Sequence, residues 1–107
     1  MKLAIDLFTG IGTSAKKLAL EHDVVFAVDY FLTSISLEDI HNNIRDFPNI
    51  VTLKASPDYL VKAFREKSVD TLVINSDNED IIRYVTTLWT PKIRGSLIYG
   101  RNIIACS

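Results

Sequence analysis

Two carboxylates and two glycines near the N-terminus have the spacing of a site for a nucleoside-like ligand. The apolar run Leu3–Phe8 contains Asp6 and leads into a turn with Gly10 and Gly12, and Asp29 follows about twenty residues after Gly10. Glycine lets a ligand come close to backbone N–H groups, and a carboxylate accepts hydrogen bonds from two adjacent ribose hydroxyls. The pattern therefore predicts a cofactor crevice at these residues.

Asp6 bears on which cofactor this crevice would take. The stretch Gly10–Ala15 matches the dinucleotide pattern G-x-G-x-x-A, but Asp6 lies four residues before Gly10. A carboxylate there would repel a pyrophosphate, whereas it would attract a cationic ligand. S-adenosylmethionine carries both a sulfonium and an amino group, so Asp6 favours this cofactor over NAD.

The same residues carry a resemblance to a known family. Asp6–Thr13, read as D-L-F-T-G-I-G-T, resembles motif I of the class I S-adenosylmethionine-dependent methyltransferases. Val25–Asp29 resembles motif II of that family, and Val69–Asp77 resembles motif IV. Leu88–Gly100 resembles the helix, turn and strand that end in L-x-P-G-G-x-I in many small-molecule methyltransferases. The similarity runs over nearly the whole chain.

The resemblance implies S-adenosylmethionine as the cofactor and a site along the glycine turn. Gly10 and Gly12 would let the cofactor approach the backbone. Asp6 would lie toward its amino-acid end, and Asp29 would hold the ribose. Tyr30 would pack on the adenine or be an ordinary boundary aromatic residue. The predicted cofactor-binding residues are Asp6, Phe8, Gly10, Gly12, Asp29, Tyr30 and Asn75.

The resemblance supplies no catalytic residue. Adenine and guanine N-methyltransferases of this superfamily have N-P-P-Y-like residues after the fourth strand, where this chain reads N-S-D-N at 75–78. Metal-dependent O-methyltransferases place Asp and His ligands there, and a metal needs such charged or imidazole donors held close together. Cytosine C5 enzymes need a Pro-Cys pair, which this sequence lacks. We predict no metal site, and the catalytic residues and the methyl acceptor stay open.

Apolar, β-branched runs alternate with helically spaced apolar residues along the chain. The runs predict strands at Leu3–Phe8, Val24–Val28, Ile50–Leu53, Thr71–Ile74 and Ser96–Tyr99. Continuous apolar character is typical of strands covered on both faces, and alternation with helices implies parallel pairing through right-handed crossovers. We expect an α/β fold of three layers, a Rossmann-like parallel sheet of about five strands with helices on both faces. A flavodoxin-like strand order also suits the pattern.

Start and stop signals place the helices between these strands. Ser36–Asp39 resembles a capping box, and Ser56–Asp58 offers an N-cap followed by a proline in the first turn. Asp77–Asp80 can begin the last helix, with Pro91 marking its end and Gly95 the turn into the fifth strand.

Composition restricts the partners and the compartment. The 107 residues suit a single domain, 1–107, and the net charge of −1 does not indicate nucleic acid or a membrane surface as a partner. The one cysteine, Cys106, excludes a disulfide scaffold, and the N-terminus lacks the features of a signal peptide. No apolar run approaches the length of a membrane span. We therefore expect a cytoplasmic protein.

The end of the chain differs from the family pattern. The superfamily fold usually carries two more strands after the fifth, and at most one very short strand fits into residues 101–107. The fifth strand, Ser96–Tyr99, would then be an uncovered edge, and such edges invite pairing with another chain. We expect a homo-oligomer that buries this edge together with Ile103 and Ile104.

Three functions agree with these residues. The first is a minimal S-adenosylmethionine-dependent methyltransferase with an unknown acceptor. The second is a non-catalytic binding or interaction protein that retains the methyltransferase fold. The third is a flavodoxin-like nucleotide-binding module, which strand order would distinguish from the other two.

Overall fold

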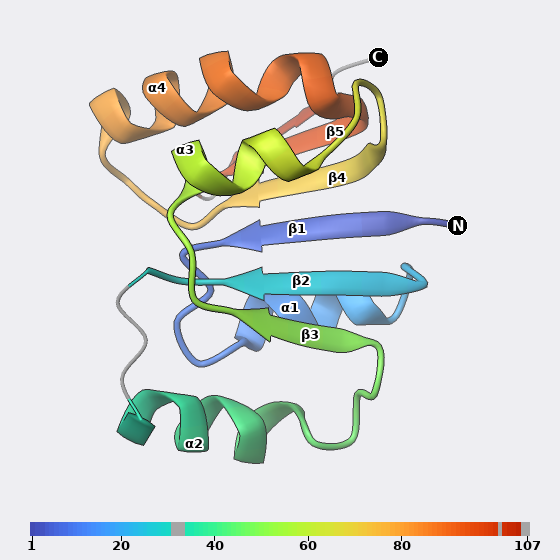
Figure 1. Cartoon of the computed structure of the whole chain (residues 1–107), viewed down its shortest axis with the longest axis vertical. Helices are drawn as coiled ribbons and strands as arrows, with labels where there is room; N and C mark the ends of the chain where they lie inside the picture. The colour runs from blue at the N-terminus through green and yellow to red at the C-terminus, as the bar shows by residue number, and fades with distance from the viewer. Residues whose placement is uncertain (31–33, 101, 106–107) are drawn as a thin grey trace.

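Five parallel strands and one antiparallel strand form a single sheet in the order β3-β2-β1-β4-β5-β6 (Figure 1). The structure is a computed structural model that describes residues 1–30, 34–100 and 102–105, with the side chains of 1–30 and 37–100. The strands are β1 Leu3–Leu7, β2 Val24–Val28, β3 Ile50–Leu53, β4 Val69–Ile74, β5 Ile93–Tyr99 and β6 Asn102–Ala105. This is the Rossmann-like order, so the flavodoxin-like alternative is wrong.

The helices cover both faces of the sheet. In Figure 1, α1 lies behind the strands and α3 lies in front of them. The helices are α1 Thr13–Ala19, α2 Ser34–Ile44, α3 Pro57–Leu60 and α4 Glu79–Trp89, with short 3-10 turns η1 Val61–Ala63 and η2 Thr90–Lys92. Among the described residues no helix is long and apolar enough to cross a bilayer.

Alternate residues of the strands build a separate core on each face. On the α1 and α2 side, Ala4, Val25 and Ala27 pack with Ile40 and Ile44 of α2. On the α3 and α4 side, the buried cluster contains Ile5, Leu72, Leu97, Val85 and Trp89. Because side chains alternate along a strand, Asp6 belongs to the same face as Ala4, beneath α1.

Of the three helix starts predicted from the sequence, one agrees with the structure and two differ. Ser56 is the N-cap of α3 and Pro57 is its first residue, as predicted. The N-cap of α4 is Asn78 rather than Asp77, because the Asn78 side chain accepts hydrogen bonds from the backbone N–H groups of Asp80 and Ile81. Helix α2 begins at Ser34, so Ser36 lies inside the helix and is not its cap.

The fifth strand differs from the prediction at both ends. Gly95 lies inside β5 rather than in a turn before it. A Cβ atom at Gly95 would overlap the carbonyl oxygen of Asp70 in β4. β5 is not an edge either, since β6 pairs with it antiparallel, Tyr99 opposite Asn102 and Ser96 opposite Ala105. The sheet edge therefore lies on β6. Cys106 and the side chains of Ile103 and Ile104 lie outside the described part.

Candidate functional site

Asp6 is a buried carboxylate that joins three segments of the chain. Its side chain has no exposed surface, and it accepts hydrogen bonds from three side chains. Thr9 Oγ1 donates at 2.7 Å from the glycine turn, Ser14 Oγ lies 2.7 and 2.9 Å from the two oxygens, and Asn75 Nδ2 donates at 2.8 Å from the end of β4. Both oxygens are thus engaged inside the fold, which argues against direct contact between Asp6 and a cationic ligand.

Burial and hydrogen bonding act in opposite directions on this carboxylate. Burial raises the pKa of Asp6, because a low-dielectric environment disfavours the ionised form, while the bonds from Thr9, Ser14 and Asn75 lower it. Burial is the larger effect, so the pKa of Asp6 is above its ordinary value. The three donors therefore compensate only part of the cost of placing a charge beneath α1.

The network fixes the orientation of the Asn75 amide. Nδ2 donates to Asp6 at 2.8 Å and to the Leu7 carbonyl oxygen at 2.9 Å, and both partners accept only. The amide oxygen must therefore point away from β1, and no donor within the described residues meets it. Asn75 lines a crevice of about 350 Å³ beside α1, with Ser14, Val73, Ile98 and Gly100 among its walls. We infer that this oxygen is available to a donor in the crevice.

The turn after β1 contains three left-handed backbone positions within five residues. Phe8 has φ 57°, Gly10 has φ 60° and Gly12 has φ 89°. Phe8 is unusual among them, because residues other than glycine seldom adopt this backbone conformation. Such strained residues are often found at functional sites. A Cβ atom at Gly10 would meet nothing within 4 Å, so this glycine borders open space at the surface.

Helix α2 holds the turn from one side. Asn43 Nδ2 donates to the Ile11 carbonyl oxygen at 2.6 Å, and Lys16 Nζ donates to Asn43 Oδ1 at 3.1 Å. A Cβ atom on Gly12 would lie 2.9 Å from Ile44 Cγ2, so only glycine permits this approach of helix and turn without a shift. The close contact explains the second glycine of the motif by packing as well as by backbone conformation.

Asp29 holds the turn from the other side. The Gly10 N–H donates to Asp29 Oδ2 at 3.3 Å, which connects the end of β2 to the turn after β1. Tyr30 follows and is 54% exposed. The structure thus joins four of the predicted site residues in two pairs, Asp6 with Asn75 and Gly10 with Asp29, and it places Phe8 and Gly12 in the same turn.

Sequence reasoning did not select three residues that complete this arrangement: Thr9, Ser14 and Asn43. Thr9 and Ser14 lie three and eight residues after Asp6, within or just after motif I. Their hydroxyls could have been suggested as partners, because a buried carboxylate needs donors. No sequence signal pairs Asn43 with Ile11.

Strand order explains why these residues meet. β1 lies between β2 and β4, and both neighbours are parallel to it, so the carboxyl ends of all three strands are adjacent. In open α/β sheets, ligands bind outside the carboxyl ends, where the connections turn to opposite faces. Here α1 follows β1 onto one face of the sheet, and α4 follows β4 onto the other.

Comparison with solved structures shows the same fold in several proteins. An rRNA methylase from Streptococcus thermophilus matches with a TM-score of 0.76 and 17% identity, over 92% of this chain and 60% of that one. A precorrin 8w decarboxylase from Methanobacterium thermoautotrophicum matches with a TM-score of 0.73 and 16% identity, over 92% and 53%. M. capricolum TrmK, solved with S-adenosylhomocysteine, matches with a TM-score of 0.71 and 17% identity, over 92% and 44%.

This chain has the class I methyltransferase fold. No family model and no curated protein sequence matches it. The chain spans less than two thirds of each of the three solved structures above. These structures resemble the chain in fold, and one of them is named a decarboxylase. The reaction of this chain must therefore be argued from its site.

Proposed function

We propose that this chain binds S-adenosylmethionine at the carboxyl ends of β1, β2 and β4, where the glycine turn, Asp29 and Asn75 lie, and acts in methyl transfer. The observation that carries the proposal is the convergence of the glycine turn, Asp29 and Asn75 at the point where the connections diverge. One solved structure of this fold, TrmK, holds S-adenosylhomocysteine, the product of this cofactor.

The residues present suit such a cofactor. Gly10 borders open space at the turn, so an adenosyl group can approach the backbone. Asp29 would accept from ribose hydroxyls, and Tyr30 and Phe8 would border the adenosine part. The Asn75 oxygen would accept from the amino group of the methionine part, while Asp6 would act through Asn75 and Ser14 as a positioning residue.

Calorimetric titration with S-adenosylhomocysteine tests this proposal. We expect saturable binding in the micromolar range and at least tenfold weaker binding for Asp29→Ala, because a charge-assisted hydrogen bond is lost. Asp46→Ala, at an exposed carboxylate after α2, is the matched control and should leave the affinity unchanged. Absence of binding by the folded wild-type chain at millimolar ligand would refute the proposal.

A second candidate is a binding protein without catalysis. After β4 the polar side chains serve the fold: Ser76 Oγ accepts from the Asn78 N–H, and Asn78 caps α4. The carboxylate that contacts Asn75, Asp6, is buried and bonded by Thr9 and Ser14, so it is not placed to act on a bound acceptor. Binding of the cofactor without conversion of S-adenosylmethionine in the presence of RNA or small-molecule acceptors would favour this candidate.

We further propose that the protein is cytoplasmic and self-associates through β6 rather than through the fifth strand. Of the described strands only β5 neighbours β6, so one side of β6 presents unpaired backbone groups. A second copy can pair there strand to strand. Light scattering at high micromolar concentration is expected to give the mass of a dimer or larger assembly, and a strict monomer would contradict this.

A further inference from the structure

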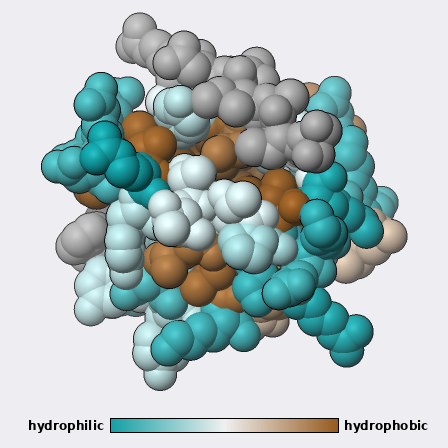
Figure 2. Space-filling model, turned by 90° about the horizontal axis from the view of Figure 1, so that it is seen from above, coloured by the Kyte–Doolittle hydropathy of each residue, from teal (hydrophilic) through white to brown (hydrophobic). Residues whose placement is uncertain are grey.

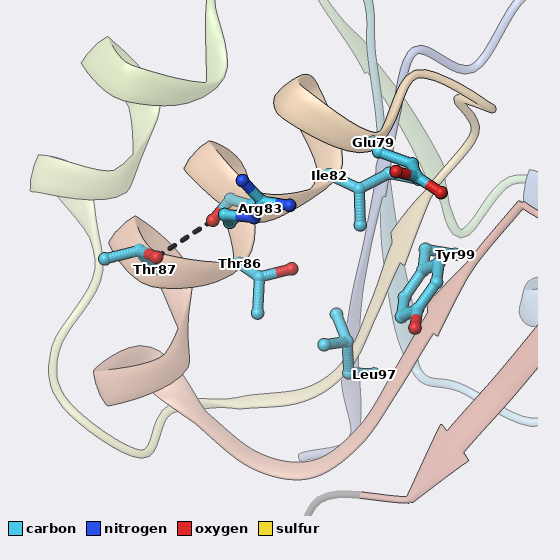
Figure 3. Close-up of a pocket in the computed structure, with 7 residues that line it drawn as sticks. All are labelled: Glu79, Ile82, Arg83, Thr86, Thr87, Leu97 and Tyr99. Carbon is cyan, nitrogen blue, oxygen red and sulfur yellow. Dashed lines mark hydrogen bonds between the residues drawn. The ribbon is translucent and has the colours of Figure 1, made fainter.

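A second cavity lies on the other face of the sheet from the crevice beside Asn75. It measures about 590 Å³, between one side of α4 and the residues of β5 that point toward it. Its walls include Glu79, Ile82, Arg83, Thr86, Leu97 and Tyr99. Figure 3 shows Ile82 and Thr86 of α4 facing Leu97 and Tyr99 of β5 across this space. Its volume is in the range of small-molecule sites.

Thr86 places an unpartnered hydroxyl in this cavity. Within residues 1–30 and 37–100, its Oγ1 is the one buried side-chain nitrogen or oxygen without a hydrogen-bond partner. Two other threonines of this region donate to carbonyl oxygens four residues earlier, Thr87 to Arg83 at 2.9 Å and Thr90 to Thr86 at 2.6 Å. The Thr86 hydroxyl instead points into the space bounded by Ile82, Leu97 and Tyr99 (Figure 3). A buried hydroxyl without a partner is costly, so a guest that bonds to it would be favoured.

Arg83 supplies a positive charge next to this hydroxyl. Residues three apart on a helix lie on the same side, so one group can contact both Arg83 and Thr86. Arg83 is exposed and has no ion pair within the described part of the chain. Guanidinium N–H groups and a threonine hydroxyl can all donate, so an anionic group such as a carboxylate can accept from both residues at once.

The remaining walls define the rest of the ligand. Ile82, Leu97 and the Tyr99 ring offer apolar surface, which suits a hydrocarbon or aromatic body. Glu79 lies one helical turn before Arg83 and would repel a second anionic group, so the far end of the ligand is expected to be uncharged. Figure 2 shows the molecule from above, with apolar surface between weakly polar residues and hydrophilic residues to its left and right.

We propose that this cavity is a second binding site, separate from the cofactor crevice, for a small apolar monocarboxylate. The carboxylate lies between the Arg83 guanidinium and the Thr86 hydroxyl, and its apolar body lies on Leu97 and Ile82. The proposal does not depend on cofactor binding, because this cavity and the crevice beside Asn75 lie on opposite faces of the sheet and share no lining residue. None of the predicted cofactor-binding residues lines this cavity either.

Titration with 3-phenylpropionate, followed by ¹H–¹⁵N NMR, tests the site. We expect saturable shifts at the amides of Arg83, Thr86, Leu97 and Tyr99, and none at Gly10 or Gly12. The neutral amide 3-phenylpropionamide should bind about tenfold more weakly, because it loses the charge-assisted bonds. No saturable shift at millimolar acid, or equal binding of acid and amide, would overturn the proposal.

Thr86→Val and Thr90→Val form a matched pair of variants. Both remove a hydroxyl, but Thr90 does not line the cavity and its hydroxyl is bonded to the Thr86 carbonyl oxygen, so only Thr86→Val should weaken binding, by about tenfold. Thr86→Val should also raise the melting temperature of the ligand-free protein, because it removes an unsatisfied buried group. Arg83→Gln should abolish the preference for the acid over the amide. If Thr86→Val stabilises the protein while the probe fails to bind, the cavity holds water alone and the proposal fails.

Discussion

Asp6 and Asn75 are 69 residues apart in the chain and are joined by a hydrogen bond of 2.8 Å between Asn75 Nδ2 and Asp6 Oδ1. The bond crosses from the interior of β1 to the residue after β4. Asn75 Nδ2 also donates to the Leu7 carbonyl oxygen. These two bonds hold the amide with its oxygen toward the crevice. Asp6 thereby acts on the candidate site through its neighbours.

Asp6→Ala should destabilise the fold strongly. The substitution leaves the hydroxyls of Thr9 and Ser14 and the Asn75 amide without their buried acceptor, for a loss of about 3 kcal/mol in the free energy of unfolding. Urea titration measures this loss. Asp23→Ala removes an exposed carboxylate that accepts from the Lys2 N–H, and it should cost about 1 kcal/mol or less. Equal losses in the two variants would contradict the assigned role of Asp6.

Asp6→Asn should change how stability depends on pH. Burial raises the pKa of Asp6 above its ordinary value of 3.8, so the folded chain holds this proton more tightly than the unfolded chain does. The resulting contribution is fully present below the unfolded pKa and is lost as pH rises through the folded pKa. The free energy of unfolding of the wild type minus that of Asp6→Asn should therefore fall as pH increases across this range and then level off. Urea titrations at several pH values measure this difference, and a rise with pH would show that the hydrogen bonds outweigh burial.

Asn43→Ala should weaken cofactor binding if the glycine turn forms the site. The substitution removes the 2.6 Å bond to the Ile11 carbonyl oxygen and releases the turn from α2. We expect about tenfold weaker binding of S-adenosylhomocysteine by calorimetry, well below the melting temperature of the variant. Asn42→Ala, at the exposed neighbouring position, is the control. If the wild type binds and Asn43→Ala binds equally well, the turn does not need this contact, although the proposed function stands.

The two glycines of the turn should differ in their tolerance of alanine. Gly10→Ala meets no atom and carries only the cost of a left-handed backbone, about 1 kcal/mol. Gly12→Ala has a similar backbone cost and also forces Ile44 to move, so it should cost about 2 kcal/mol or more. Thermal unfolding of the two variants gives the ranking. A larger loss for Gly10→Ala would mean that α2 packs less closely on the turn than the structure describes.

Much of the fold follows from local pattern. Val24–Val28 and Ile50–Leu53 are strands with the predicted bounds, because short apolar runs between turn signals have few alternatives. β4 and β5 begin earlier than predicted, at Val69 and Ile93. Gly95 misled the prediction of β5, since a glycine chosen for close approach to Asp70 looks the same in sequence as one chosen for a turn.

The candidate site was only partly predictable. Asp6, Gly10 and Asp29 stand out because their spacing matches a known backbone geometry. Two donors to Asp6, Thr9 and Ser14, lie within eight residues of it in the sequence. The third, Asn75, comes close only because β1 pairs with β4. The contact of Asn43 with Ile11 depends on how α2 packs over the turn, which local pattern does not encode.

The central position of β1 has a consequence for synthesis on the ribosome. β1 emerges first, yet one of its two neighbours, β4, is completed only at Ile74, and Asp6 meets its last partner at Asn75. Until then Asp6 lacks one of its three donors, and the walls of the crevice that β4 and β5 supply have yet to be made. The proposed cofactor site therefore forms late in translation, and a chain interrupted before residue 75 is expected to bind no cofactor.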